Sequence, residues 1–100
     1  MRVLELDASG AKTTKQFAAL LREVIEAIPG HGSSVESFVD SMVFGTMSNL
    51  APPYTVRVSG IATDEVAAFA HRLAEALGQA RLENRTRRGE DVQVVLRIVD

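Results

Sequence analysis

The chain has 100 residues, 46% of them hydrophobic, and a formal net charge of −2 at pH 7, which are values typical of one globular domain over residues 1–100. It contains no cysteine, which excludes disulfides and thiolate metal sites and is consistent with the reducing cytoplasm where we expect the protein to reside. No apolar run approaches the roughly 20 residues that span a bilayer, the N-terminus begins with a strand pattern rather than a signal peptide, and the slightly acidic balance argues against general nucleic-acid binding.

Alternating apolar and acidic residues predict a short strand over residues 3–7. The next apolar residues recur at helical spacing over residues 17–28, behind a potential cap at Thr13 or Thr14. We expect Pro29-Gly30 to end this helix, because proline cannot continue the hydrogen-bond ladder and glycine tolerates the reversal that follows.

A second helix is predicted over residues 34–44, where the apolar residues again form one stripe. Ser33 and Glu36 have the spacing of a capping box, in which each side chain bonds the free backbone N–H of the other residue. Glu36 and Asp40 lie four residues apart on a different face, where two like charges destabilise an isolated helix by roughly a few tenths of a kcal/mol. The sequence offers them no paired cation, so this acidic pair is the first functional candidate.

Residues 45–53 form a connection rich in Gly, Ser, Asn and Pro, and residues 54–58 alternate as a second strand. Thr63 is expected to cap a third helix, whose buried stripe comprises Val66, Phe69, Ala70, Leu73 and Leu77. Residues 80–88 are compatible either with a continuation of this helix or with a strand, and the sequence leaves that open. β-Branched residues predict a third main strand over residues 92–99.

This order of elements predicts a three-stranded parallel sheet joined by right-handed crossovers. Each strand keeps a polar face, formed by Glu5 and Asp7, by Thr55 and Arg57, and by Gln93 and Arg97. Because parallel strands buried on both faces are apolar throughout, we expect a two-layer α/β domain with its helices packed on one face of the sheet. Opposite charges can pair across the other face.

Several stretches together carry a family resemblance. They are the N-terminal strand, the helix over residues 17–28, the run Gly-Ser-Ser-Val-Glu-Ser-Phe-Val-Asp at residues 32–40, and Pro52-Pro53-Tyr54 before the second strand. With these features the chain resembles the barstar-like ribonuclease inhibitors over residues 1–59, while beyond them only the order of elements is shared. The resemblance implies the barstar-like two-layer fold.

The resemblance also implies a function. Proteins of that family stay inside the cell that makes a secreted ribonuclease, and they plug its active site with carboxylates that stand in for RNA phosphates. By position, Asp40 matches the central acid of the plug and Glu36 the acid one turn earlier, and a further interface acid falls at Glu83 or Asn84. The loop and helix positions around them are His31, Gly32, Ser34 and Val39.

We therefore expect a protein inhibitor or immunity protein without enzymatic activity, metal or cofactor, whose partner is a ribonuclease or related nuclease-type toxin. His31 and His71 are isolated in the sequence from other potential catalytic or metal-binding groups. The family commonly carries an aromatic residue where this chain has Val39, so the identity of the nuclease, and whether barnase itself is bound, stays open. The oligomeric state is also open, with a monomer favoured.

Two rival interpretations belong to other classes. The first is a regulatory or structural interaction module that self-associates through the open face of the sheet. The second is a nucleic-acid-binding domain centred on the arginines of residues 81–88, although the chain has few aromatic residues on which bases could stack. A solvated helix end is the simpler interpretation of that arginine cluster.

Overall fold

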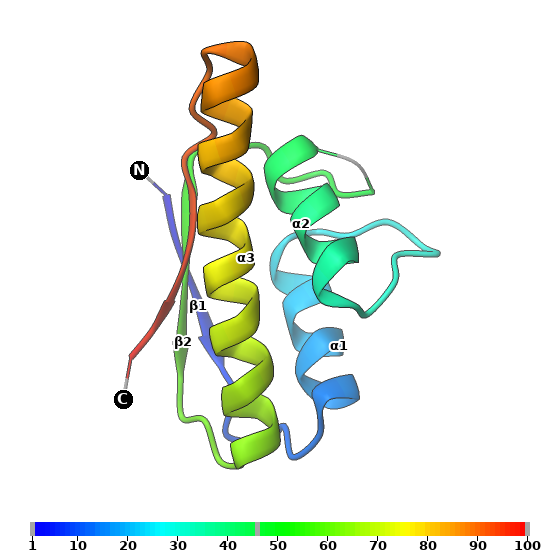
Figure 1. Ribbon diagram of the computed structural model, residues 1–100. Helices are drawn as coiled ribbons and strands as arrows, with labels where there is room; N and C mark the ends of the chain where they lie inside the picture. The colour runs from blue at the N-terminus through cyan, green and yellow to red at the C-terminus, as the bar shows by residue number, and fades with distance from the viewer. Residues whose placement is uncertain (1, 46, 100) are drawn as a thin grey trace.

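The computed structural model describes residues 2–45 and 47–99. They form β1 (Arg2–Asp7), α1 (Thr14–Val24), α2 (Val35–Phe44), β2 (Tyr54–Ser59), α3 (Asp64–Arg88) and β3 (Val94–Ile98). The strands make one parallel sheet in the order β1-β2-β3, and the helices lie on one face of it (Figure 1). The predicted two-layer α/β fold is confirmed. Thr46, in the predicted connection over residues 45–53, lies outside the described residues.

The strands alternate between the helical layer and the open face of the sheet. Val56 and Val58 of β2 are fully buried, whereas Arg57 between them is exposed. The register places Glu5 of β1 beside Arg57, and the guanidinium Nη1 donates to the Glu5 carboxylate at 2.8 Å. This ion pair confirms that opposite charges on neighbouring strands meet across the open face.

One phenylalanine from each helix fixes the helical layer. The rings of Phe17 in α1 and Phe38 in α2 both meet Phe69 of α3 edge-on, with centroid distances of 5.9 and 6.3 Å. The three side chains are buried, and edge-to-face pairs contribute about 0.5–1.5 kcal/mol each beyond the burial of their area. The helical stripes predicted from the spacing of apolar residues therefore converge on one aromatic centre.

The first helix ends earlier than expected. Thr13 caps α1 as predicted, but the helix stops at Val24 rather than at Pro29, and Glu26 adopts a φ of +57°. Residues 26–28 pair with residues 47–49 instead, through an antiparallel bridge of Ala27 with Ser48 and flanking backbone hydrogen bonds. Pairing with a distant segment thus satisfies backbone groups that a longer helix would have used.

The open question over residues 80–88 is answered, because α3 continues as a helix to Arg88. Ala80 and Asn84 extend its buried stripe, and Gly89 ends it in the left-handed conformation at a φ of +69°. Arg81 forms a bidentate ion pair with Asp91, which ties the helix to the segment before β3 and lowers the pKa of Asp91. Neither α3, at 25 residues, nor another helix in the described ranges is long and apolar enough to cross a membrane.

Tyr54, at the start of β2, introduces a polar atom into the core. Its side chain is fully buried, and its hydroxyl has no hydrogen-bond partner among the described residues. Burial disfavours the charged phenolate and raises the pKa of Tyr54 to about 12. An unsatisfied buried hydroxyl costs roughly 1–3 kcal/mol, so this atom reduces the stability of the fold.

We expect Tyr54→Phe to leave the free energy of unfolding unchanged, or to raise it by about 1 kcal/mol, because the ring stays while the unpaired hydroxyl goes. The pKa in the unfolded chain is about 10, so the folded state holds its proton more tightly. In the native protein, the free energy of unfolding should keep its full value below about pH 10 and decrease as the pH rises towards 12, because the Tyr54 hydroxyl ionises first in the unfolded chain. The Tyr54→Phe variant lacks this hydroxyl and should not show this part of the decrease. Urea unfolding at about pH 7 and about pH 11 measures both effects. A variant less stable than the native protein at neutral pH would contradict this account.

Candidate functional site

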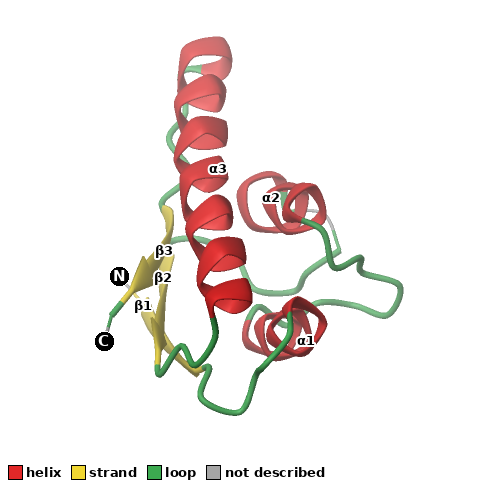
Figure 2. Cartoon of the chain, turned by 60° about the horizontal axis from the view of Figure 1, so that its bottom comes forward, coloured by secondary structure: helices red, strands yellow, loops and turns green. Residues whose placement is uncertain are grey.

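An open groove of about 380 Å³ lies between α2 and α3. We call it the acidic groove, and its lining residues are Val35, Glu36, Val39, Asp40, Ala76, Gln79, Ala80 and Glu83. Four come from each helix, so the groove exists only because two segments some 40 positions apart in the chain pack side by side, as Figure 2 also shows for the two helices.

Small side chains on α3 account for the hollow. Ala76, Ala80 and Glu83 are spaced by four and three residues and therefore share one face of the helix. Because an alanine side chain ends at Cβ, the space opposite Val35 and Val39 of α2 is not filled. The groove consequently combines apolar walls with charged groups along its edges.

The charged groups are three exposed carboxylates, Glu36 and Asp40 from α2 and Glu83 from α3. Within residues 2–45 and 47–99, the ion pairs join Glu5 to Arg57 and Asp91 to Arg81, and neither pair involves the groove. The groove carboxylates therefore face solvent without a counter-ion from the described part of the chain. Such a surface attracts cationic groups of a binding partner.

Three carboxylates at one place also raise the question of a metal site, since carboxylate oxygens are the preferred ligands of Mg²⁺ and Ca²⁺. In the part of the chain that the structure describes, no three His, Asp or Glu side chains gather closely enough to hold a metal ion. The spread of the groove carboxylates suits several separate cationic side chains better than one ion.

The cap of α2 lies one residue later than predicted. Ser34 is the N-cap, and its hydroxyl oxygen accepts the backbone N–H of Ser37 at 3.1 Å. Ser33 instead accepts a hydrogen bond from the guanidinium of Arg22 in α1. The predicted capping box of Ser33 with Glu36 is therefore wrong. Glu36 lies in the first helical turn, where its negative charge is favoured by the helix dipole.

His31 is a buried anchor of the loop before α2. Its ring packs on Phe38 at a centroid distance of 4.9 Å, and its two nitrogens contact the Ser41 hydroxyl and the Gly32 carbonyl. A carbonyl oxygen only accepts, so the Nδ1–H donates to Gly32, while the Ser41 hydroxyl donates to the Ser37 carbonyl oxygen at 2.8 Å. Ser41 is itself buried, which places this Ser–His contact inside the protein rather than at an accessible catalytic position.

Gly32 has a packing role in the same loop. A Cβ atom at this position would lie 2.5 Å from the Oγ atom of Ser37, so a larger residue would displace the serine that α2 uses in its first turn. Gly32 and His31 thus position the start of α2, and with it the carboxylates of the acidic groove.

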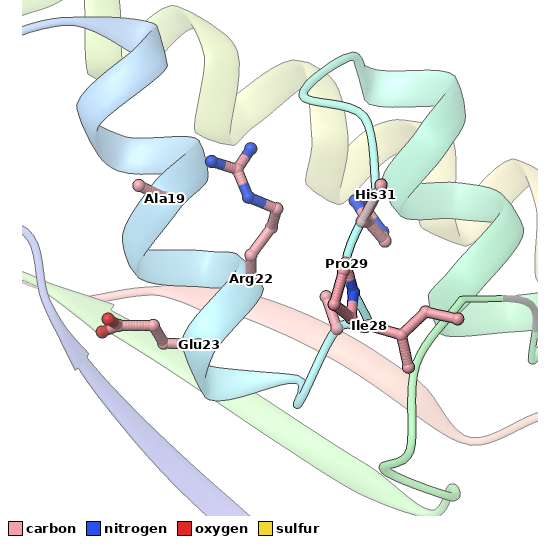
Figure 3. A pocket seen from close by; sticks show the side chains of 8 residues that line it. Ala19, Arg22, Glu23, Ile28, Pro29 and His31 are labelled. Atoms are coloured by element: carbon pink, nitrogen blue, oxygen red, sulfur yellow. The ribbon is translucent and has the colours of Figure 1, made fainter.

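A second cleft, of about 400 Å³, lies between α1 and the segment of residues 27–31 (Figure 3). Arg22 and Glu23 supply one charge of each sign, and the Arg22 guanidinium is engaged with Ser33. His31 lines the same cleft, but both of its nitrogens are occupied. This cleft therefore presents no cluster of free groups of one charge, in contrast to the acidic groove.

The arginine cluster at the end of α3 is divided between two roles. Arg81 is held by Asp91, whereas Arg85, Arg87 and Arg88 are exposed in the last turns of the helix, where cations complement its dipole. The aromatic side chains that are fully or almost fully buried, Phe17, Phe38, Phe69 and Tyr54, are not accessible for base stacking. Phe44 is 47% exposed but lies at the end of α2 rather than on α3, so the arginine cluster has no exposed aromatic residue on its own helix.

Four of the seven predicted partner-binding residues line the groove, namely Glu36, Val39, Asp40 and Glu83. Asn84, the alternative to Glu83, is buried, and its side-chain amide donates a hydrogen bond to the Glu90 carbonyl oxygen. His31, Gly32 and Ser34 lie in the supporting loop and cap. Ala76 and Ala80, which form the α3 wall, were not among the predicted residues, although their spacing of four indicates that they share one side of the third helix. The sequence matches no protein-family model and no curated protein.

We expect His31→Ala to lower the free energy of unfolding by about 2–3 kcal/mol, because it removes a buried ring, its hydrogen bond to Ser41 of α2 and its hydrogen bond to Gly32 within the loop. His71 is exposed on α3 and serves as the matched control, with an expected effect of His71→Ala within about 0.5 kcal/mol. Denaturant unfolding compares the two variants, and equal small losses would show that His31 is not an anchor.

Proposed function

We propose that this protein is an inhibitor or immunity partner of a ribonuclease or related nuclease toxin, and that it binds this partner through the acidic groove. The observation that carries the proposal is the set of three exposed carboxylates around an apolar hollow, without counter-ions from the described residues. The resemblance of residues 32–40 to barstar-like inhibitors supports the same surface.

The chemistry of a nuclease explains why such a surface would inhibit it. An enzyme that cleaves RNA must be basic where it holds phosphates, and carboxylates of matching geometry can occupy that place. Charge complementarity speeds the encounter and selects the partner, while removal of one member of a buried charged pair costs about 2–5 kcal/mol. An inhibitor of this kind acts by occlusion and needs no catalytic group of its own.

The groove suggests a division of roles. Asp40 enters the phosphate-binding centre, Glu36 supports it from the preceding turn, and Glu83 adds a charge from α3. Barstar-like inhibitors commonly carry an aromatic ring at the position of Val39. In this chain, Val39 and the facing alanines of α3 leave a hollow there. In this proposal the partner supplies the larger apolar side chain, which fills the hollow between its own cations.

We expect Asp40→Ala to raise the dissociation constant for the nuclease by at least about thirtyfold, equivalent to about 2 kcal/mol, while leaving the free energy of unfolding nearly unchanged. Asp40 is exposed and has no ion pair in the described ranges, so its removal leaves no buried group unpaired. The change is measured by titrating a nuclease with the inhibitor and following RNA cleavage. The nuclease is taken from a neighbouring gene or captured with this protein as bait.

Glu23→Ala is the matched control, because Glu23 is an exposed acid on α1 that lines the second cleft rather than the groove. It should inhibit as well as the native protein. If Glu23→Ala lost inhibition while Asp40→Ala retained it, the contact surface would be the second cleft and the groove would have no part in inhibition.

A further inference from the structure

The face of the sheet turned away from the helices is uncovered among the described residues (Figure 2). Parallel sheets are normally covered on both faces, so this exposure is unusual. We call it the open sheet face, and its outward-facing residues are Val3, Glu5, Asp7, Thr55, Arg57, Ser59, Val95 and Arg97.

The strand register arranges these residues in rows across the sheet. Val3, Thr55 and Val95 form one row, and Glu5, Arg57 and Arg97 form the next. Val3 is 52% exposed, which is unusual for a valine in a strand. Arg97 is exposed and forms no ion pair within the described ranges. Val3, an apolar residue at the edge of the sheet, and the cation Arg97 are thus exposed on this face.

Charge is distributed unevenly over this face. Both acids, Glu5 and Asp7, lie on β1, whereas Arg57 and Arg97 lie on β2 and β3. The face is neutral as a whole but acidic along one edge and basic along the other. A surface with that pattern is complementary to a copy of itself in one orientation.

We propose that a second copy of this chain covers the open sheet face, related to the first by a twofold axis that runs along β2, parallel to the strands. This rotation lays β1 of each copy over β3 of the other. Glu5 then meets Arg97 of the second copy, and Val3 meets its Val95, so that both uncovered residues gain a partner. Arg57 faces its own counterpart on the axis, where Glu5 already neutralises it.

Charge also disfavours the second arrangement that keeps the strands of the two copies aligned. A twofold axis that lies in the interface across the strands, through the charged row, would place Glu5 over Glu5 and Arg97 over Arg97. Like charges directly opposite each other are repulsive. The aligned stacking of two sheets with nearly parallel strands is also the common geometry of packed sheets.

The size of the face determines how strongly the copies associate. Three strands about 4.8 Å apart, with residues about 3.3 Å apart along each, cover roughly 15 by 20 Å. That is well below the roughly 800 Å² per partner of a standard stable interface, so the dimer is weak and reversible. It leaves the acidic groove exposed in both copies, because the groove lies in the helical layer.

Sedimentation velocity from about 10 µM to about 1 mM protein tests the proposal, over a range where weak dimers dissociate and form. The native protein should shift from monomer to dimer, and less so at high salt. Arg97→Glu and Glu5→Arg, each at an exposed position, should each raise the dimer dissociation constant at least about tenfold. The double variant exchanges the two charges, restores the complementary pattern and should recover dimerisation.

Lys15→Glu makes the same charge change as Arg97→Glu at an exposed position on α1 and should leave dimerisation unchanged. Circular dichroism checks that each variant is folded, and Arg97→Glu leaves the Glu5–Arg57 pair intact. The proposal is overturned if the native protein is monomeric at every concentration, if Arg97→Glu dimerises normally, or if the double variant is no better than the single ones. Asp40→Ala should dimerise normally, so failure here is distinct from failure of the proposed inhibitory function.

Discussion

The contact of three phenylalanine rings, one from each helix, is the interaction on which the helical layer depends. Phe38 is the ring that α2 contributes, and it points into the aromatic centre beside Phe69. Residues two positions away on a helix point to nearly the opposite side, about 200° around its axis. Burying Phe38 therefore turns Glu36 and Asp40 outward. The charged edge of the groove is thus a geometric consequence of the packing of the core.

The sequence predicted the features that depend on a local period. Alternation along the strands predicted both the buried side of the sheet and the polar face where Glu5 meets Arg57. Helical spacing predicted the stripes that meet at the phenylalanine rings, and the Thr63 cap follows from its position before two acidic residues. The acidic pair of α2 was visible for the same reason, because both members belong to a single helix.

Features that depend on contacts between distant segments could not be predicted from local sequence patterns. The early end of α1 follows from the bridge of Ala27 with Ser48, and Ser33 is diverted from capping by Arg22 of another helix. The groove needs α2 and α3 to lie side by side, so Glu83 joined the predicted site only through the family resemblance. The Ser41–His31 contact likewise joins residues ten positions apart across a loop. Local pattern specifies elements, whereas tertiary packing specifies which of their faces meet.

The central claim is that the partner binds between α2 and α3. Titration of the isotopically labelled protein with the proposed nuclease partner, followed by backbone amide chemical shifts, tests that claim most directly. The account predicts that the largest changes fall on residues 35–40 and 76–83, the two segments that line the groove. Changes confined to the cleft of residues 19–31 or to the open sheet face, with the groove amides unmoved, would contradict it.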